Sequence, residues 1–402
     1  MKNSFINVAA TEKNENWNNM IKRETELYTR KNDLRSEFAR DYTRILHCNA
    51  YRRLKHKTQV FFSPTSDHVC TRSEHVCYVD SISNTIANYL GLNTELTKAI
   101  ASSHDIGHSP FGHKGEKVLN EISLRDIGQS FWHEKNGVHF VDNIELLEDA
   151  NGDLKNLNLT YAVRDGIISH CGEIDENSLK PRTQAIDLKD YTKPNEYSPY
   201  TWEACVVKIS DKISYIGRDI EDAFHLNLLN NEKLEELKNI LGIQNKEALN
   251  NPNIVNELIV DICDNSSIER GICFSTEKLN LINKIKEFNY KNIYLHPRLE
   301  ASDEYFKVII NRIYNTLKSA YDKENTLNNL ENLKKFYPQT IIRFKDWLHK
   351  YWNLTDRTNT NLKNKIIYDY AKPQDYYKAI IDFIAGMTDN YAIDMYNEIV
   401  SF

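Results

Sequence analysis

Hydrophobic side chains recur every three or four residues along most of the chain, which is the spacing of amphipathic α-helices. One such pattern runs from His75 to Leu90, and Gly91 ends it, as glycine commonly ends helices. Asn93 or Thr94 can cap a second helix that follows directly. A longer pattern covers Ala204 to Phe224. These segments predict helices that each bury one apolar face.

A Ser-Pro-Phe-Gly segment at residues 109–112 breaks the second of these helices, and we expect a new helix to begin near His113. No long stretch alternates apolar and polar residues, so the sequence predicts an all-α fold with at most a short β-hairpin, near Thr58 to Phe62. The expected organisation is an N-terminal arm at residues 1–34, a helical core at 35–230 and a C-terminal helical region at 231–402 that packs on the core.

The composition indicates a folded protein from a reducing compartment. Hydrophobic residues make up 41% and charged residues 27% of the 402 residues, which excludes a disordered chain. The formal net charge of -6 gives no overall basic character for binding nucleic acid, although residues 52–57 form a local basic patch. The seven cysteines are scattered and form no Cys-X-X-Cys pair. Without an apolar signal segment or a run of ~20 apolar residues, we expect a cytoplasmic protein with no membrane partner.

Nine of the 13 histidines fall between His47 and His139, and two of them stand in an arrangement that suits a metal ion. A lone histidine on a helix is more often a core or surface residue. Here, however, His75 opens one predicted helix and His104-Asp105 ends the next, while Asp211 interrupts the apolar face of a third. A buried carboxylate needs a partner, because an unpaired buried charge costs several kcal/mol. Two imidazoles and two carboxylates suit a borderline or hard divalent ion and leave coordination positions open, as catalytic sites do.

The order of these residues resembles a known superfamily. His75, His104-Asp105 and Asp211 match the H…HD…D pattern of the HD superfamily. The string His104 to Glu116, HDIGHSPFGHKGE, is similar to the deoxyguanosinetriphosphate triphosphohydrolase family within it. Further matching segments are Arg35–Tyr42, Arg52–Leu54, Lys57–Phe61, Thr71–His75, Asp211–Ala223 and Gly386–Asp389. The resemblance therefore covers about residues 35–225 and a short late motif, and it implies an HD-domain helical core.

By this resemblance, His75, His104, Asp105 and Asp211 bind a divalent metal ion, Mn²⁺ or Mg²⁺, with Fe, Co or Ni also compatible. The family also uses a histidine and an acid just after the HD pair for catalysis, and these positions are His113 and Glu116. Their i, i+3 spacing places both on one helix face, where a carboxylate can orient an imidazole that moves a proton. The plain alternative is a helix N-terminus with an acid in its first turn.

The resemblance also implies a phosphate and sugar site. His108 and His133 are similar to positions that line the phosphate site, and we assign His133 to the catalytic group. Arg72 and Lys212 match phosphate-contacting positions, and cations should converge on a triphosphate. The remaining substrate candidates are Gln59 for the 3′-hydroxyl and Tyr215 and Asp219 for phosphate and sugar. The spacing i, i+4, i+8 places Asp211, Tyr215 and Asp219 on one face of a helix, where they can line one wall of a site. His170 also lies in a segment similar to some bacterial members, without an assignable role.

The implied activity is hydrolysis of deoxynucleoside triphosphates to deoxynucleoside and inorganic triphosphate. Two other interpretations stay open: an HD-type phosphodiesterase or 5′-nucleotidase, and a module that senses nucleotides or binds single-stranded nucleic acid. The resemblance also implies a possible deoxynucleotide effector acting allosterically and a homo-oligomer of even order, a dimer-based tetramer or hexamer.

Overall fold

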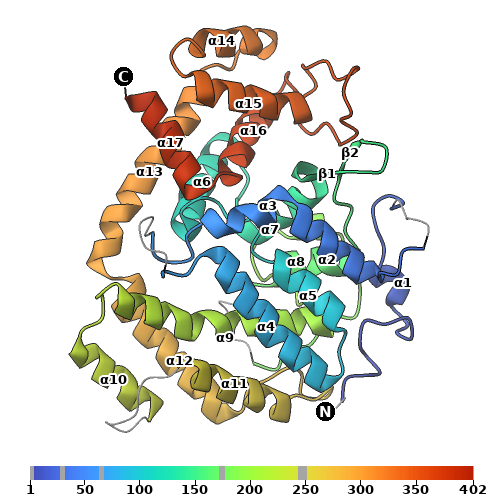
Figure 1. Ribbon diagram of the computed structural model, residues 1–402, viewed down its shortest axis with the longest axis vertical. Coiled ribbons are helices and arrows are strands. Elements are labelled where there is room, and N and C mark those ends of the chain that lie inside the picture. The colour runs from blue at the N-terminus through green and yellow to red at the C-terminus, as the bar shows by residue number, and fades with distance from the viewer. Residues whose placement is uncertain (1–3, 28–31, 63–67, 172–176, 243–250, 402) are drawn as a thin grey trace.

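The computed structural model describes residues 4–27, 32–62, 68–171, 177–242 and 251–401, and it is built almost entirely of helices (Figure 1). This confirms the predicted all-α class. The α-helices in the described ranges are α1 (Trp17–Met20), α2 (Glu37–His47), α3 (Asn49–Arg53), α4 (Arg72–Leu90), α5 (Thr94–Ser103), α6 (Gly112–Asp126), α7 (His133–His139), α8 (Tyr161–Ser169), α9 (Trp202–His225), α10 (Asn231–Leu241), α11 (Asn251–Asn265), α12 (Thr276–Asn289), α13 (Pro297–Lys318), α14 (Thr326–Leu333), α15 (Pro338–Tyr351), α16 (Pro373–Ala385) and α17 (Asp389–Val400).

Local capping sets the ends of the helices that carry the site. The Thr71 hydroxyl accepts from the backbone N–H of Glu74, and the Glu74 carboxylate accepts from the backbone N–H of Thr71, so a capping box starts α4. Gly91 ends that helix in the left-handed conformation with φ 84°, and the Asn93 side chain then caps α5. The predicted stop and cap are confirmed.

The hairpin expected near Thr58 to Phe62 is not formed by the residues that the structure describes, and residues 63–67 lie outside them. Within the described residues, Thr58 makes only an isolated bridge to Thr71, because its N–H and hydroxyl bond to the Asp389 carboxylate instead. The two-stranded antiparallel sheet lies elsewhere, between β1 (Leu146–Glu148) and β2 (Leu154–Asn156), with Leu147 opposite Lys155. An Asn-Gly turn connects the two strands, and Gly152 has φ 82°.

Two apolar clusters hold the helices together. One joins α5 to the C-terminal helices through side chains such as Ile100, Ile313 and Ile380. The other joins α4, α9 and α12 through side chains such as Ile86, Ile213 and Ile282. Each fully buried side chain of this size contributes ~1.5–3 kcal/mol relative to an exposed one. In Figure 1, α13 runs along one edge and leads from the lower helices to α14–α17 at the upper end.

The segment between α16 and the start of α17 contacts the loop that joins α5 to α6. The Asp389 carboxylate accepts from the backbone N–H of Phe111 at 2.8 Å and from that of Thr58 at 2.8 Å. The buried Lys57 amine donates to the backbone carbonyls of His108 and Ala385. These contacts explain structurally why a late motif, Gly386–Asp389, accompanies the early ones. None of the described helices is both long and apolar enough to cross a bilayer.

Candidate active site

The four residues predicted to bind a metal ion converge at one place from α4, the end of α5 and α9. His75 Nε2 lies 2.9 Å from Asp211 Oδ1 and 3.4 Å from His104 Nε2. Asp105 offers Oδ1 at 3.6 Å from His104 Nε2 and Oδ2 at 3.8 Å from His75 Nε2. An ion with bonds of about 2.0–2.2 Å to nitrogen and oxygen brings neighbouring ligand atoms to about 3 Å from one another. The donor types and their spacing therefore fit a divalent ion with only small side-chain shifts.

The two imidazoles are held so that their Nε2 atoms face this group. His104 Nδ1 lies 2.7 Å from the carbonyl oxygen of Ala101, and His75 Nδ1 lies 3.2 Å from Ser214 Oγ. A histidine whose Nδ1 is engaged by a backbone or hydroxyl oxygen is the usual arrangement for ligation through Nε2. His104 is 0% exposed and His75 is 5% exposed, so both rings are also fixed by packing.

The electrostatics of the group favour bound cations. Burial raises the pKa of Asp105, but neighbouring imidazoles and the Arg72 guanidinium outweigh it and hold that pKa well below its usual range. Burial likewise acts to raise the pKa of Asp211, and its hydrogen bond with His75 lowers it overall. Both carboxylates are therefore ionised near neutral pH. Burial lowers the pKa of His75, yet the adjacent Asp211 and Asp105 raise it overall.

Arg72, predicted to contact phosphate, bonds to a carboxylate of the metal group. Its Nη1 lies 2.8 Å from Asp105 Oδ2, and the side chain is 1% exposed. Among the described residues, its Nε and Nη2 atoms have no hydrogen-bond partner. A buried guanidinium with unsatisfied N–H groups suits an incoming anion, because such donors are costly to leave unpaired.

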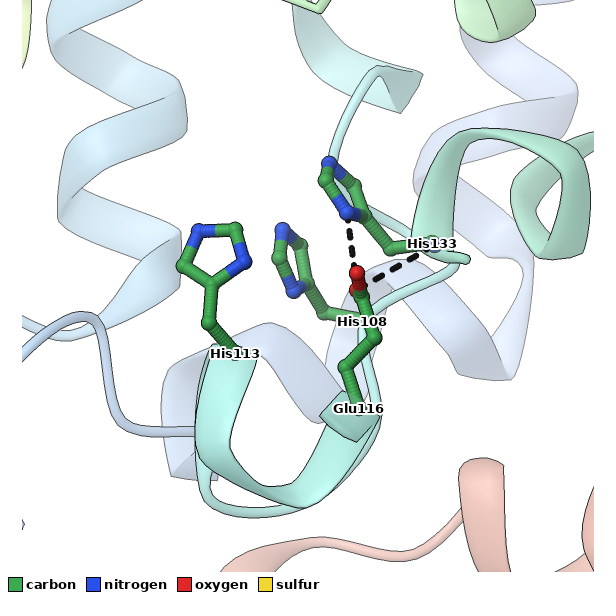
Figure 2. A group of neighbouring side chains, drawn as sticks. All are labelled: His108, His113, Glu116 and His133. Carbon is green, nitrogen blue, oxygen red and sulfur yellow. Dashed lines mark hydrogen bonds and ion pairs between the residues drawn. The ribbon is translucent and has the colours of Figure 1, made fainter. Parts of the chain in front are cut away.

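A second cluster lies beside the first and contains His108, His113, Glu116 and His133 (Figure 2). Glu116 Oε2 accepts from His133 Nδ1 at 2.8 Å and from the backbone N–H of His133 at 3.2 Å. The His108 ring stacks on His133 with centroids 3.8 Å apart, and the His113 ring lies 5.0 Å from His108. The structure thus pairs Glu116 with His133, whereas the sequence suggested a pair with His113.

This second cluster is joined to the first through Asp105, whose Oδ1 lies 3.1 Å from His108 Nε2. Burial lowers the pKa of His133, but the charges of Glu134 and Glu116 raise it overall to about 10. Burial and the nearby Arg72 hold the pKa of His108 well below its usual range. At neutral pH the cluster therefore combines one charged imidazole with one neutral imidazole, stacked face to face.

The wall formed by α9 carries the remaining predicted residues on that helix. Asp219 is 3% exposed and accepts a hydrogen bond from the Tyr294 hydroxyl, and burial raises its pKa to about 7. Lys212 is also buried, while Tyr215 is half-buried. The backbone carbonyl oxygen of Gln59 would lie 3.3 Å from a Cβ at Gly112, and the side-chain Oε1 of Gln59 is buried without a hydrogen-bond partner among the described residues.

Sequence reasoning missed several residues around these clusters. Tyr294 lies in the part of the chain where no motif could be matched, and nothing distinguished it from the 22 other tyrosines. Lys57 and Asp389 lie in segments that match the family, but the sequence gives neither residue a role of its own. His170, which had no assigned role, lies with its ring 5.0 Å from His104 and 5.3 Å from His133. Its signal in the sequence was the similarity of its surroundings to some bacterial proteins.

Comparison with known proteins agrees with this arrangement. A model of the HD domain matches residues 72–216, and a model of a phosphohydrolase-associated domain matches residues 272–398. A deoxyguanosinetriphosphate triphosphohydrolase-like protein of Caldanaerobacter subterraneus is 32% identical over 91% of this chain and 86% of its own length. Proteins of the same description from Rickettsia prowazekii and Clostridium tetani are 31% and 30% identical, each over 91% of this chain and over 92% and 86% of their own lengths.

Proposed function

Because the chain belongs to the deoxyguanosinetriphosphate triphosphohydrolase-like family of HD-domain proteins, we propose that it hydrolyses deoxynucleoside triphosphates to deoxynucleoside and inorganic triphosphate. The observation that carries this proposal is the junction of two clusters. The first is the group of His75, His104 and Asp211 with Asp105 beside it. The second is a set of histidines that face the proposed phosphate site and contact the first cluster through Asp105 and His108 at 3.1 Å.

The first set holds a divalent ion, Mn²⁺ or Mg²⁺ or another borderline ion. When bound, this ion supplies Lewis-acid polarisation of a phosphate oxygen and favours ionisation of water. His75 and His104 bind through Nε2, since their Nδ1 atoms are engaged elsewhere. Asp105 and Asp211 supply oxygen ligands and balance the charge of the ion.

In the proposed reaction, water adds to the α-phosphorus, the bond from that phosphorus to the 5′-oxygen breaks, and the deoxynucleoside leaves with a proton on its 5′-oxygen. His113 is exposed at the start of α6 and delivers that proton. Glu116 keeps His133 charged, so His133 binds phosphate oxygens as a cation. Arg72 and Lys212 add positive charge for the phosphates, while the neutral ring of His108 donates from Nε2 to Asp105 Oδ1 at 3.1 Å.

Gln59, Tyr215 and Asp219 form the proposed sugar side. Asp219 can accept from the 3′-hydroxyl, with Gln59 approaching the same group from the opposite wall. Tyr215, one turn of α9 before Asp219, excludes a 2′-hydroxyl by its bulk. We also propose that the chain acts as a homo-oligomer of even order, with deoxynucleotide effectors and single-stranded nucleic acid as further ligands to be tested.

The decisive experiment is product analysis with each deoxynucleoside triphosphate, singly and as a mixture of four, with Mn²⁺ or Mg²⁺. Release of inorganic triphosphate together with free deoxynucleoside supports the proposal. Release of pyrophosphate or single phosphates, or hydrolysis of cyclic or linear phosphodiesters only, would replace it with the phosphodiesterase or 5′-nucleotidase function. Nucleotide binding without turnover by the metal-loaded wild-type protein would indicate a sensor.

A further inference from the structure

Helix α13 (Pro297–Lys318) lies along one edge of the molecule, and one of its faces is open to solvent (Figure 1). Each residue of an α-helix is turned about 100° from the one before it, so residues three, four and seven apart share a face. At these spacings from Val308, which is itself exposed, Asn311 is half-buried and the other residues are exposed: Ala301, Glu304, Tyr305, Arg312 and Asn315. We call this set with Val308 the outer face of α13.

The opposite face of α13 is fixed on the helix that carries His113. The Phe306 ring stacks on the Phe111 ring with centroids 4.3 Å apart and an interplanar angle of 5°. The Asp303 carboxylate forms an ion pair with Lys114 on α6. The outer face is therefore held in one position, which lowers the entropy lost when a partner binds to it.

The centre of the outer face is apolar. Val308 is 50% exposed, and Tyr305 beside it is 41% exposed. A single exposed apolar residue is ordinary, but two neighbours on one fixed helix face favour a contact surface. Ala301 and Asn315 lie seven residues before and after Val308, and both are small. Small side chains along this line allow a second helix to approach with its axis about 8–10 Å away.

The charges on the outer face are arranged symmetrically about Val308. Glu304 precedes it by four residues and Arg312 follows it by four. Among the described residues, the ion pairs of α13 use Asp303 and Lys318 instead, and both of these point to α6. A helix with opposite charges at equal distances from its centre is complementary to a second copy of itself that runs in the opposite direction, because each acid then faces the base of the other copy.

We propose that α13 packs antiparallel against α13 of a second copy of this chain, with a twofold axis at Val308. Glu304 of each chain then pairs with Arg312 of the second copy. The Tyr305 ring lies beside the same guanidinium, where a cation–π contact is favourable. The contact is isologous, so it closes as a pair. It names one surface of the even-order assembly proposed above and rests on that part of the proposed function.

The charge pattern selects this arrangement over its alternatives. A parallel pair brings Glu304 of both chains together and Arg312 of both chains together, which is unfavourable. An unrelated partner would have to match the symmetry about Val308 by coincidence, whereas a second copy matches it by construction. The helix alone supplies fewer residues than the about 20–30 on each side of a standard interface, so we expect a dissociation constant on the order of micromolar for this contact.

Exchange of the two charges tests the pairing on the full chain. Sedimentation velocity over a range of micromolar concentrations compares the wild type with Glu304→Arg, Arg312→Glu and the double variant. Each single change brings like charges together twice and should raise the dissociation constant about tenfold or more, whereas the double variant restores opposite charges and should associate nearly as tightly as the wild type.

The matched control is Lys307→Glu, because Lys307 is exposed on α13 but turned about 100° away from Val308. It should leave association unchanged. The proposal is overturned if the single variants associate as tightly as the wild type, or if the double variant associates no more tightly than the single ones.

A cysteine at the axis provides a test that does not depend on charge. Only at a twofold axis does a residue meet its own copy, so Val308→Cys should form a disulfide between two chains under mild oxidation, and Lys307→Cys should not. Both changes are made in a Cys77→Ser background, because Cys77 is exposed. This test still decides where a charge variant fails to fold.

Inorganic triphosphate release is measured on the same samples. An even-order assembly without the cross-link refutes this surface alone. A wild-type monomer that releases triphosphate refutes the assembly and leaves the proposed reaction standing. Cross-linked pairs without triphosphate release support the surface and refute only the reaction.

Discussion

Asp389 supports the site from the far end of the sequence, and its removal should destabilise the protein measurably. The carboxylate is 5% exposed and accepts from the backbone N–H groups of Phe111 and Thr58 and from the Thr58 hydroxyl. Phe111 is buried and has φ 63°, a left-handed conformation that costs a residue with a side chain roughly 1–2 kcal/mol. The Asp389 bond helps to hold it in that conformation.

The expected magnitude follows from the donors left behind. A buried N–H without an acceptor costs ~1–3 kcal/mol. Asp389→Ala removes the acceptor of two backbone N–H groups, those of Phe111 and Thr58. Since Thr58 is only half-buried and its N–H can reach water, we expect a loss of about 2–4 kcal/mol in the free energy of unfolding. Asp389→Asn keeps one acceptor oxygen and should recover part of the loss. The same change releases the start of α6, so kcat should fall as well.

Urea denaturation followed by circular dichroism measures the change, and Asp394→Ala is the matched control because Asp394 is exposed on the same helix, α17. Surface substitutions of this kind usually stay within about 0.5 kcal/mol. If the free energy of unfolding of Asp389→Ala lies within about 0.5 kcal/mol of that of Asp394→Ala, the Asp389 carboxylate does not support the loop and the reasoning is refuted.

Three further predictions concern the site itself. Asp211→Ala should lose the bound metal ion and all turnover, as measured by metal analysis and product release. Full activity in chelator-stripped protein would exclude the assigned ligands. His113→Ala should lower kcat about 10²-fold or more, while metal content and nucleotide affinity stay nearly unchanged. Glu116→Gln should lower kcat by a comparable or smaller factor. A near-normal kcat in His113→Ala would exclude a role of His113 in proton transfer. In the metal-free protein, burial raises the pKa of Asp219 from 3.8 to about 7. Between these pH values the folded protein keeps a proton that the unfolded chain releases, so the free energy of unfolding should fall as the pH rises. Asp219→Asn should remove this part of the pH dependence, and an unchanged stability profile would show that Asp219 titrates normally.

The helices near the site could be predicted because their signals are local. Gly91 and Asn93 act on their own helix ends, and the apolar period of α9 needs no knowledge of its neighbours. The position of the hairpin could not be predicted from strand propensity alone, because the backbone N–H of Thr58 bonds to Asp389, which lies 331 residues away in the sequence. The Asn-Gly turn between β1 and β2 was the better local signal.

The family resemblance indicated which side chains would come together, but it could not predict the pairing among them. Glu116 reaches His133 because α7 lies very close to the loop after α5. A Cβ at Gly107 would lie 2.1 Å from the carbonyl oxygen of His133 and 2.2 Å from the backbone nitrogen of Gly137. Two glycines therefore permit this approach, and an i, i+3 argument restricted to α6 has no access to it. The same holds for His170, whose neighbours come from other helices.

The hydrogen bond from the Phe111 N–H to Asp389 also determines when the loop between α5 and α6 can be completed during synthesis of the chain. All four proposed metal ligands have been made once residue 211 is complete, yet the acceptor for the Phe111 N–H follows 278 residues after that loop. At ribosomal rates of about 5–20 residues per second, the loop waits roughly 15–55 s for its acceptor. A nascent chain can therefore bring its proposed metal ligands together early, but it completes the loop around His113 only after α17 has left the ribosome.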